Sequence, residues 1–87
     1  MQLDEGACAG YTVRFVKTPC APVVSVRSPG GAELLASNGA WEERIEIPAG
    51  AEFVKRGLPV LEAGEECAVK LTSARGSVQV EAISFPG

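Results

Sequence analysis

Turn-forming glycines and prolines interrupt this sequence of 87 residues at short intervals, and the segments between them alternate apolar and polar residues. Strict alternation is the period of a half-buried β-strand, whereas no segment shows the period of an amphipathic helix. Turns at this spacing are typical of a sandwich or barrel built from about seven or eight short strands. The sequence therefore predicts an all-β fold, a small antiparallel β-sandwich that is either jelly-roll-like or immunoglobulin-like.

A chain of this length forms one small core, so we expect a single domain over residues 11–87, preceded by an N-terminal arm over residues 1–10. Seven segments of the domain carry the strand pattern, and an extended piece lies around residues 58–61. The predicted strands are residues 11–17, 23–27, 32–36, 41–47, 52–56, 66–72 and 77–83.

Two of the intervening turns predict β-hairpins. The tetrad SPGG at 28–31 joins the strands of a hairpin over 23–36, and SARG joins the last two strands. SARG ends in Gly76, which is placed to adopt a left-handed conformation. In this last hairpin Leu71 is expected opposite Val78 on a buried face, and a slip of one residue would expose the valines, so the alternation defines the register.

The alternation changes at the end of the last strand, where Ile83 and Phe85 are apolar on the formerly polar face. Such a change predicts that this end of the strand is covered from the other side, by a partner or by a neighbouring segment. Other apolar residues also occupy places where a monomer would need polar ones. The candidate interface residues are Phe53, Val60, Leu61, Ile83, Phe85 and Trp41.

Trp41 is the only tryptophan, and it begins an alternating segment. Alternation places it on the apolar face with Ile45 and Ile47, so we expect it in the core or at its edge. A protein interface and a ligand platform are the two alternatives, because tryptophan is common at both. Alternation places the charged residue Glu43 on this same apolar face. This indicates a bulge or an open end of the sheet there.

The sequence offers little of the chemistry that enzymes need. It contains no histidine, which excludes Ser-His-Asp and Cys-His catalysis. A carboxylate pair from residues 42–46 or 62–66 could in principle act as a glycosidase, but that reaction needs a deep cleft, and a chain this short has little material for one. Without histidine or a C-x-x-C pair, the three cysteines do not make a zinc site, and Asp4 is the only aspartate, which excludes a calcium loop. We therefore expect no enzyme activity, no catalytic residue, no metal and no cofactor.

Cysteines stand at positions 8, 20 and 67. Nothing in the sequence indicates secretion, so we expect three reduced thiols that act as small apolar side chains. A disulfide between Cys8 and Cys20 in an oxidising environment is the alternative.

Charge and hydropathy exclude two kinds of partner. The net charge is −3 and the basic residues are scattered, which argues against nucleic acid, since phosphate binding needs a basic stripe. No apolar run approaches the roughly 20 residues that span a bilayer. The first ten residues, MQLDEGACAG, lack the basic and hydrophobic regions of a signal peptide, so we expect no membrane association and a cytoplasmic origin.

The stretches IPAGAEF and LEAGEECAVKLTSARGSVQVEAI fall within residues 39–85. In these turns and in its size the chain resembles the small β-sandwich accessory proteins of virions, such as head-decoration or minor tail components. The resemblance implies a non-enzymatic structural protein that is assembled in the host cytoplasm, resides in the virion, and binds capsid or tail subunits or itself. It transfers no site residues.

Two other functions stay open. A carbohydrate-binding module would use Trp41 and its polar neighbours as a platform, although the chain has few aromatic residues. The sequence identifies no further ligand-binding residue. An immunoglobulin-like spacer would use the order Cys20, Trp41 and Cys67, but Glu65 stands where that fold has a tyrosine.

Overall fold

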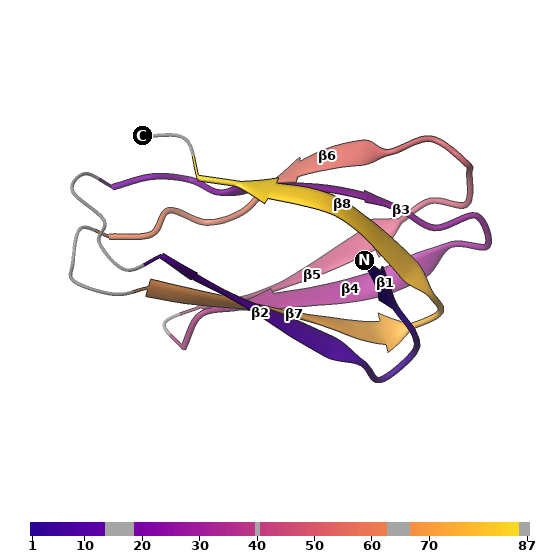
Figure 1. Cartoon of the computed structure of the whole chain (residues 1–87), viewed down its shortest axis with the longest axis horizontal. Coiled ribbons are helices and arrows are strands. Elements are labelled where there is room, and N and C mark those ends of the chain that lie inside the picture. The colour runs from indigo at the N-terminus through magenta and orange to yellow at the C-terminus, as the bar shows by residue number, and fades with distance from the viewer. Residues whose placement is uncertain (14–18, 40, 63–66, 86–87) are drawn as a thin grey trace.

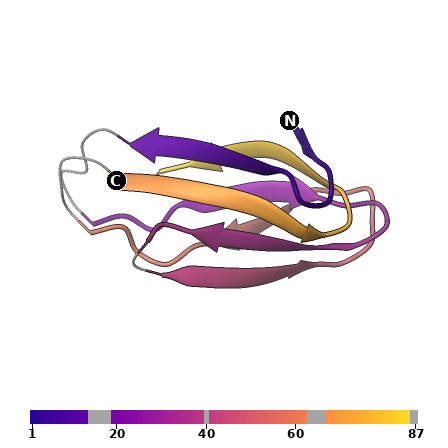
Figure 2. The ribbon, with the colours of Figure 1, turned by 90° about the horizontal axis from the view of Figure 1, so that it is seen from below.

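The computed structural model describes residues 1–13, 19–39, 41–62 and 67–85, and these residues form strands and no helix. The strands pack as two layers, each a four-stranded antiparallel sheet, so the predicted all-β sandwich is confirmed (Figures 1 and 2). Within this described part, no helix is long and apolar enough to cross a membrane. The strands are β1 (Gln2–Leu3), β2 (Cys8–Val13), β3 (Val23–Arg27), β4 (Ala32–Ser37), β5 (Glu42–Ile47), β6 (Val54–Gly57), β7 (Cys67–Arg75) and β8 (Val78–Ser84).

The strand order distinguishes the two predicted topologies. One sheet has the order β1-β8-β3-β6 and the other has β2-β7-β4-β5. The first strand therefore pairs with the last, the second with the seventh, the third with the sixth and the fourth with the fifth, all antiparallel. This nested pairing is a long hairpin wrapped into two sheets, which is a jelly roll. The immunoglobulin-like order lacks it.

Both predicted hairpins are wrong. Among the described strands, β4 and β5 are the one consecutive pair that lies side by side, because β3 to β4 and β7 to β8 pass from one sheet to the other. The two crossing turns end at Gly31 and Gly76, whose φ angles are 82° and 76°. Alternation shows which side of a strand faces the core. It is the same whether the strand pairs with the preceding strand in one sheet or crosses to the opposite sheet. The turn sequences therefore did not distinguish the two arrangements.

The predicted inner faces are correct even where the predicted pairs are not. Leu71, Val78 and Val80 are buried, although β7 and β8 lie in opposite sheets. The core lies between the sheets and contains inward side chains from both. Its fully buried members include Val24, Val26, Ala32, Leu34, Ala36, Leu61, Val69, Leu71 and Val78.

A β-bulge in β8 explains the change of pattern near the end of the chain. Val26 lies opposite Val80, but Ser25 lies opposite Ala82, so Glu81 is an extra residue in the ladder. The extra residue reverses the alternation after it. Ile83 consequently lies opposite the fully buried Val24 and packs against the core. The core, and not a partner, accounts for this apolar residue.

Residues 1–10, predicted as an arm, contribute to both sheets. Leu3 in β1 is buried, and β2 begins already at Cys8. The Met1 amino group donates to the Val80 carbonyl oxygen at 2.9 Å, and the Val80 N–H donates to the Met1 carbonyl oxygen at 2.7 Å. The predicted strand over 11–17 lies partly outside the described residues, since 14–18 are not among them.

Candidate assembly surfaces

The six predicted interface residues do not form one surface. Phe53 and Val60 are exposed by 36% and 49%, but they lie at opposite ends of the sandwich. Phe53 adjoins Arg27 at the end of β3, whereas Val60 precedes Leu61, which bridges to Cys20 before β3 begins. Ile83, Phe85 and Trp41 are partly buried and pack against the core.

Leu61 is a core residue, so its assignment to an interface is wrong. Its exposed fraction is 0%, and its backbone is fixed by two hydrogen bonds to Cys20. The Leu61 N–H donates to the Cys20 carbonyl oxygen at 2.7 Å, and the Cys20 N–H donates to the Leu61 carbonyl oxygen at 3.0 Å. In the sequence Leu61 follows another apolar residue, Val60, and this pair gives no sign of which one faces inward.

Trp41 lies just before β5, half-buried against the core. Ile45 and Ile47 are buried as predicted, so the face expected for this strand is correct. The Trp41 Nε1 atom is buried and finds no hydrogen-bond partner among the described residues. An indole placed in this way is an edge-of-core residue, as the alternation predicts.

Two loops meet at one end of the sandwich, where Ser28 bridges to Ala49 (Figure 1). The β3–β4 turn and the β5–β6 loop are joined because the Gly31 and Gly50 N–H groups both donate to the Ser28 carbonyl oxygen at 3.1 Å. The Ser28 hydroxyl in turn donates to the Ser77 carbonyl oxygen at 2.7 Å. We call the exposed apolar residues held here the loop-end patch, which comprises Pro29, Pro48, Ala49, Ala51 and Phe53.

Arg27 holds the largest side chain of the loop-end patch in place. Its guanidinium lies over the Phe53 ring, 4.9 Å from the ring centroid. It also donates from Nε and Nη2 to Gln79 Oε1 at 2.9 and 2.7 Å, and from Nη1 to the Ala51 carbonyl oxygen at 3.2 Å. A stacked and hydrogen-bonded guanidinium of this kind restricts the aromatic ring before any partner arrives. The loop-end patch is therefore preorganised. It could not be predicted from the sequence, because its residues come from separate turns.

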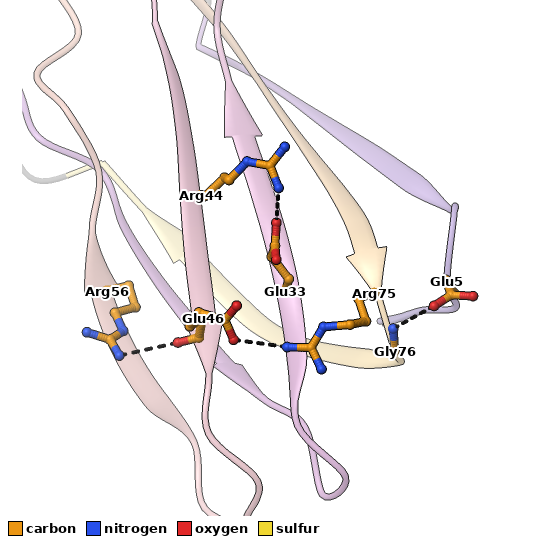
Figure 3. A network of polar contacts seen from close by, with 7 residues as sticks. All are labelled: Glu5, Glu33, Arg44, Glu46, Arg56, Arg75 and Gly76. Carbon is orange, nitrogen blue, oxygen red and sulfur yellow. Dashed lines mark hydrogen bonds and ion pairs between the residues drawn. The ribbon is translucent and has the colours of Figure 1, made fainter.

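The outer face of the sheet that contains β4, β5 and β7 is charged (Figure 3). Glu33 and Glu46 lie directly opposite each other, and each carboxylate is paired with an arginine. Glu33 pairs with Arg44, and Glu46 accepts from Arg75 at 3.0 Å. Exposed pairs of this kind contribute little stability, about 0–1 kcal/mol each. Alternating charges in such a network are typical of a solvated surface.

No group of three or more potential metal ligands occurs in the described part of the chain. Cys8 is exposed and Cys20 is buried, and both thiols are free. The side chain of Cys67 lies outside the described residues. These positions give no support for a disulfide between Cys8 and Cys20.

Phe85→Asp is expected to lower the free energy of unfolding by about 1–3 kcal/mol, because it brings a carboxylate against the core. Ser84→Asp, at the exposed neighbouring position, is the matched control and should have little effect. Urea denaturation of the two variants measures the difference. If both variants unfold like the wild type and Phe85→Asp alone associates more weakly, Phe85 belongs to an interface instead.

No known protein family matches the sequence, and no curated protein is significantly similar to it.

Proposed function

We propose that this chain is a non-enzymatic structural protein that binds other protein subunits in a large assembly, such as the capsid or tail lattice of a virus. The jelly roll is a fold that viral capsid domains use often, although it also serves lectins and cupins. Because one fold hosts many functions, the fold supports the proposal only by analogy.

The observation that carries the proposal is Phe53, the exposed aromatic residue of the loop-end patch, which is held by Arg27. An aromatic ring paired with arginine is typical of the few residues that dominate the binding energy of an interface. Because Arg27 is already held by Gln79 and the Ala51 carbonyl, the ring loses little conformational freedom on binding. A protein partner with an apolar pocket for Phe53 fits this surface.

Replacing Phe53 tests the contact. The Phe53→Ser variant is produced in the natural source in place of the wild-type chain. It should bind its assembly at least about tenfold more weakly than the wild type, as expected for a hot spot. The measurement is the fraction of the chain that sediments with large particles in a sucrose gradient. Val60→Ser is the matched control, since Val60 is also exposed and apolar but lies at the other end of the sandwich.

Three outcomes are informative. Loss of sedimentation for Phe53→Ser alone supports the loop-end contact, provided that the purified variant unfolds at nearly the wild-type urea concentration. Equal loss for both variants would show that the loop-end patch is not the specific contact. Unchanged sedimentation of Phe53→Ser would remove Phe53 from the interface.

A carbohydrate-binding module is the alternative, and a hollow beside the loop-end patch favours it. The volume of the hollow is about 530 Å³, which is in the range of small-ligand sites. It offers the polar side chains of Gln2, Ser77 and Gln79, but no aromatic ring lines it. A glycan array separates the two proposals, because binding to a defined sugar that is lost in Gln2→Ala would favour the module.

A further inference from the structure

The four sheet edges of this sandwich are protected to different degrees. An exposed edge can pair with another chain, and natural proteins block it with short strands or charged residues. The edge strand β1 has two residues, and β6 has four, including Lys55 and Arg56. The edge strand β5 has six residues, of which Glu42, Glu43, Arg44 and Glu46 are charged. The remaining edge strand, β2, has six residues, CAGYTV, and none is acidic or basic.

The backbone of β2 presents hydrogen-bonding groups on its outer side. The Ser73 N–H donates to the Ala7 carbonyl oxygen at 3.0 Å, so odd-numbered residues here point their backbone groups toward β7. By alternation Cys8, Gly10 and Thr12 point their N–H and C=O groups away from β7, and all three are exposed. No strand in the described part of the chain pairs with this side of β2.

Because β2 carries no charged side chain, a second copy of the same strand is a suitable partner for it. When a strand pairs with a copy of itself, like residues come together around the two-fold axis, and like charges placed opposite one another are destabilising. Self-pairing of β6 would bring Lys55 and Arg56 near their own copies, whereas β2 has no such conflict. Burial raises the pKa of the Tyr11 hydroxyl, so this side chain also stays neutral near pH 7.

We propose that two copies of this chain form a symmetric dimer by antiparallel pairing of β2 with β2. The pairing that uses all the outward groups places Gly10 opposite Gly10 of the second copy, and Cys8 opposite Thr12. Each of these pairs exchanges two backbone hydrogen bonds, as in an ordinary antiparallel ladder. The two sheets then join into one continuous sheet, and the unprotected edge disappears.

The dimer would present its two loop-end patches in opposite directions. The β2 residue Cys8 lies opposite Thr72, near the β7–β8 turn and therefore at the loop end, and Val13 lies toward the other end. An antiparallel arrangement reverses one copy, so the dimer could join two lattice subunits and bind more tightly than one copy alone. This bivalence rests on the proposed function, whereas the dimer itself does not.

Gly10→Lys tests the pairing. A Cβ added at Gly10 meets nothing within 4 Å and φ there is not positive, so the variant should fold. Urea denaturation of the variant checks this, because the new lysine lies opposite Lys70 of the same copy. Two lysines would then face each other across the axis and should weaken the dimer by roughly tenfold or more. Gly57→Lys is the matched control, because Gly57 is equally open and lies on the edge strand β6. Sedimentation equilibrium of the purified chain alone measures dimerisation.

The expected result is a wild-type mass that rises with concentration from 9.0 kDa to twice that value, a similar curve for Gly57→Lys, and a monomer for Gly10→Lys. A monomeric wild type at every concentration would overturn the proposal, as would a Gly10→Lys dimer of wild-type affinity or equal weakening by Gly57→Lys. Because no lattice is present, failure here leaves the loop-end contact untouched, and Phe53→Ser should still dimerise.

A second variant does not depend on the tolerance for lysine. Gly10→Cys in a Cys8→Ser background should form a disulfide-linked dimer on mild oxidation, because opposite residues of a hydrogen-bonded pair lie about 5.5 Å apart and disulfides accept Cα separations of about 4.4–6.8 Å. Gly57→Cys in the same background should stay monomeric on a non-reducing gel. Crosslinking of both variants to the same extent would contradict the assigned edge.

Discussion

Replacing Gly76 with alanine should lower the free energy of unfolding by about 2–4 kcal/mol, because two separate costs add. The φ angle of Gly76 is 76°, a conformation that costs an L-residue about 1–2 kcal/mol. The new Cβ would also lie 2.7 Å from the Gly31 carbonyl oxygen and 3.3 Å from the Ala32 Cβ. Those atoms belong to the other turn that crosses between the sheets, so the two crossings would have to separate.

The bonds around Gly76 leave little room for such a movement. The Ser73 hydroxyl donates to the Gly76 carbonyl oxygen. The Gly76 N–H donates to Glu5 Oε1 at 3.1 Å (Figure 3). Gly57→Ala is the matched control, since φ there is not positive and the added Cβ meets nothing within 4 Å. Urea denaturation compares the two variants. A Gly76→Ala protein as stable as Gly57→Ala would contradict the close contact between the crossing turns.

Leu61→Ala should lower the free energy of unfolding by about 2–5 kcal/mol, the usual cost of removing a buried leucine side chain. Leu61 is fully buried, and its backbone bonds to Cys20 hold the segment after β6 against the start of β3. The bridge between Cys20 and Leu61 fixes the two segments that contain these residues. Neighbouring side chains therefore do not move easily into the space that the leucine side chain leaves. The loss should therefore include a cavity contribution in addition to lost burial.

Val60→Ala provides the comparison for Leu61→Ala. The Val60 side chain is 49% exposed, so its truncation should change the free energy of unfolding by less than about 0.5–1 kcal/mol. Thermal unfolding of the two purified variants gives the difference directly. Equal small effects would return Leu61 to the surface, where the sequence alone had placed it.

The sequence predicted the inner faces of the strands well, and the reason is physical. Each strand has one face against the core, so alternation in a segment such as AELLAS reports burial directly. The exact bounds of β3 and the all-β class followed from this signal. The strand partners did not, because Leu71 and Val78 are buried whether β7 and β8 share a sheet or face each other across the core.

The candidate site was predicted less well than the fold. Phe53 was identified as an exposed aromatic residue, but its contacts with Arg27 and Ala51 depend on how the two end loops meet. Ile83 was assigned to an interface because the Glu81 bulge, which returns it to the core face, has no signature in a single sequence. A change of alternation late in a strand thus has two explanations, a partner or a bulge, and here the bulge explains it.

The most direct test of the assembly function is the copy number of this chain in native particles. Large particles isolated from the natural source would be separated on a gradient, and the chain would be quantified in each fraction by mass spectrometry with isotope-labelled peptides. We predict that most of the chain sediments with one kind of particle. Its copy number there should be large and a multiple of the number of symmetry-related positions in that particle. Finding the chain only as a free protein of low mass, at the top of the gradient, would contradict it.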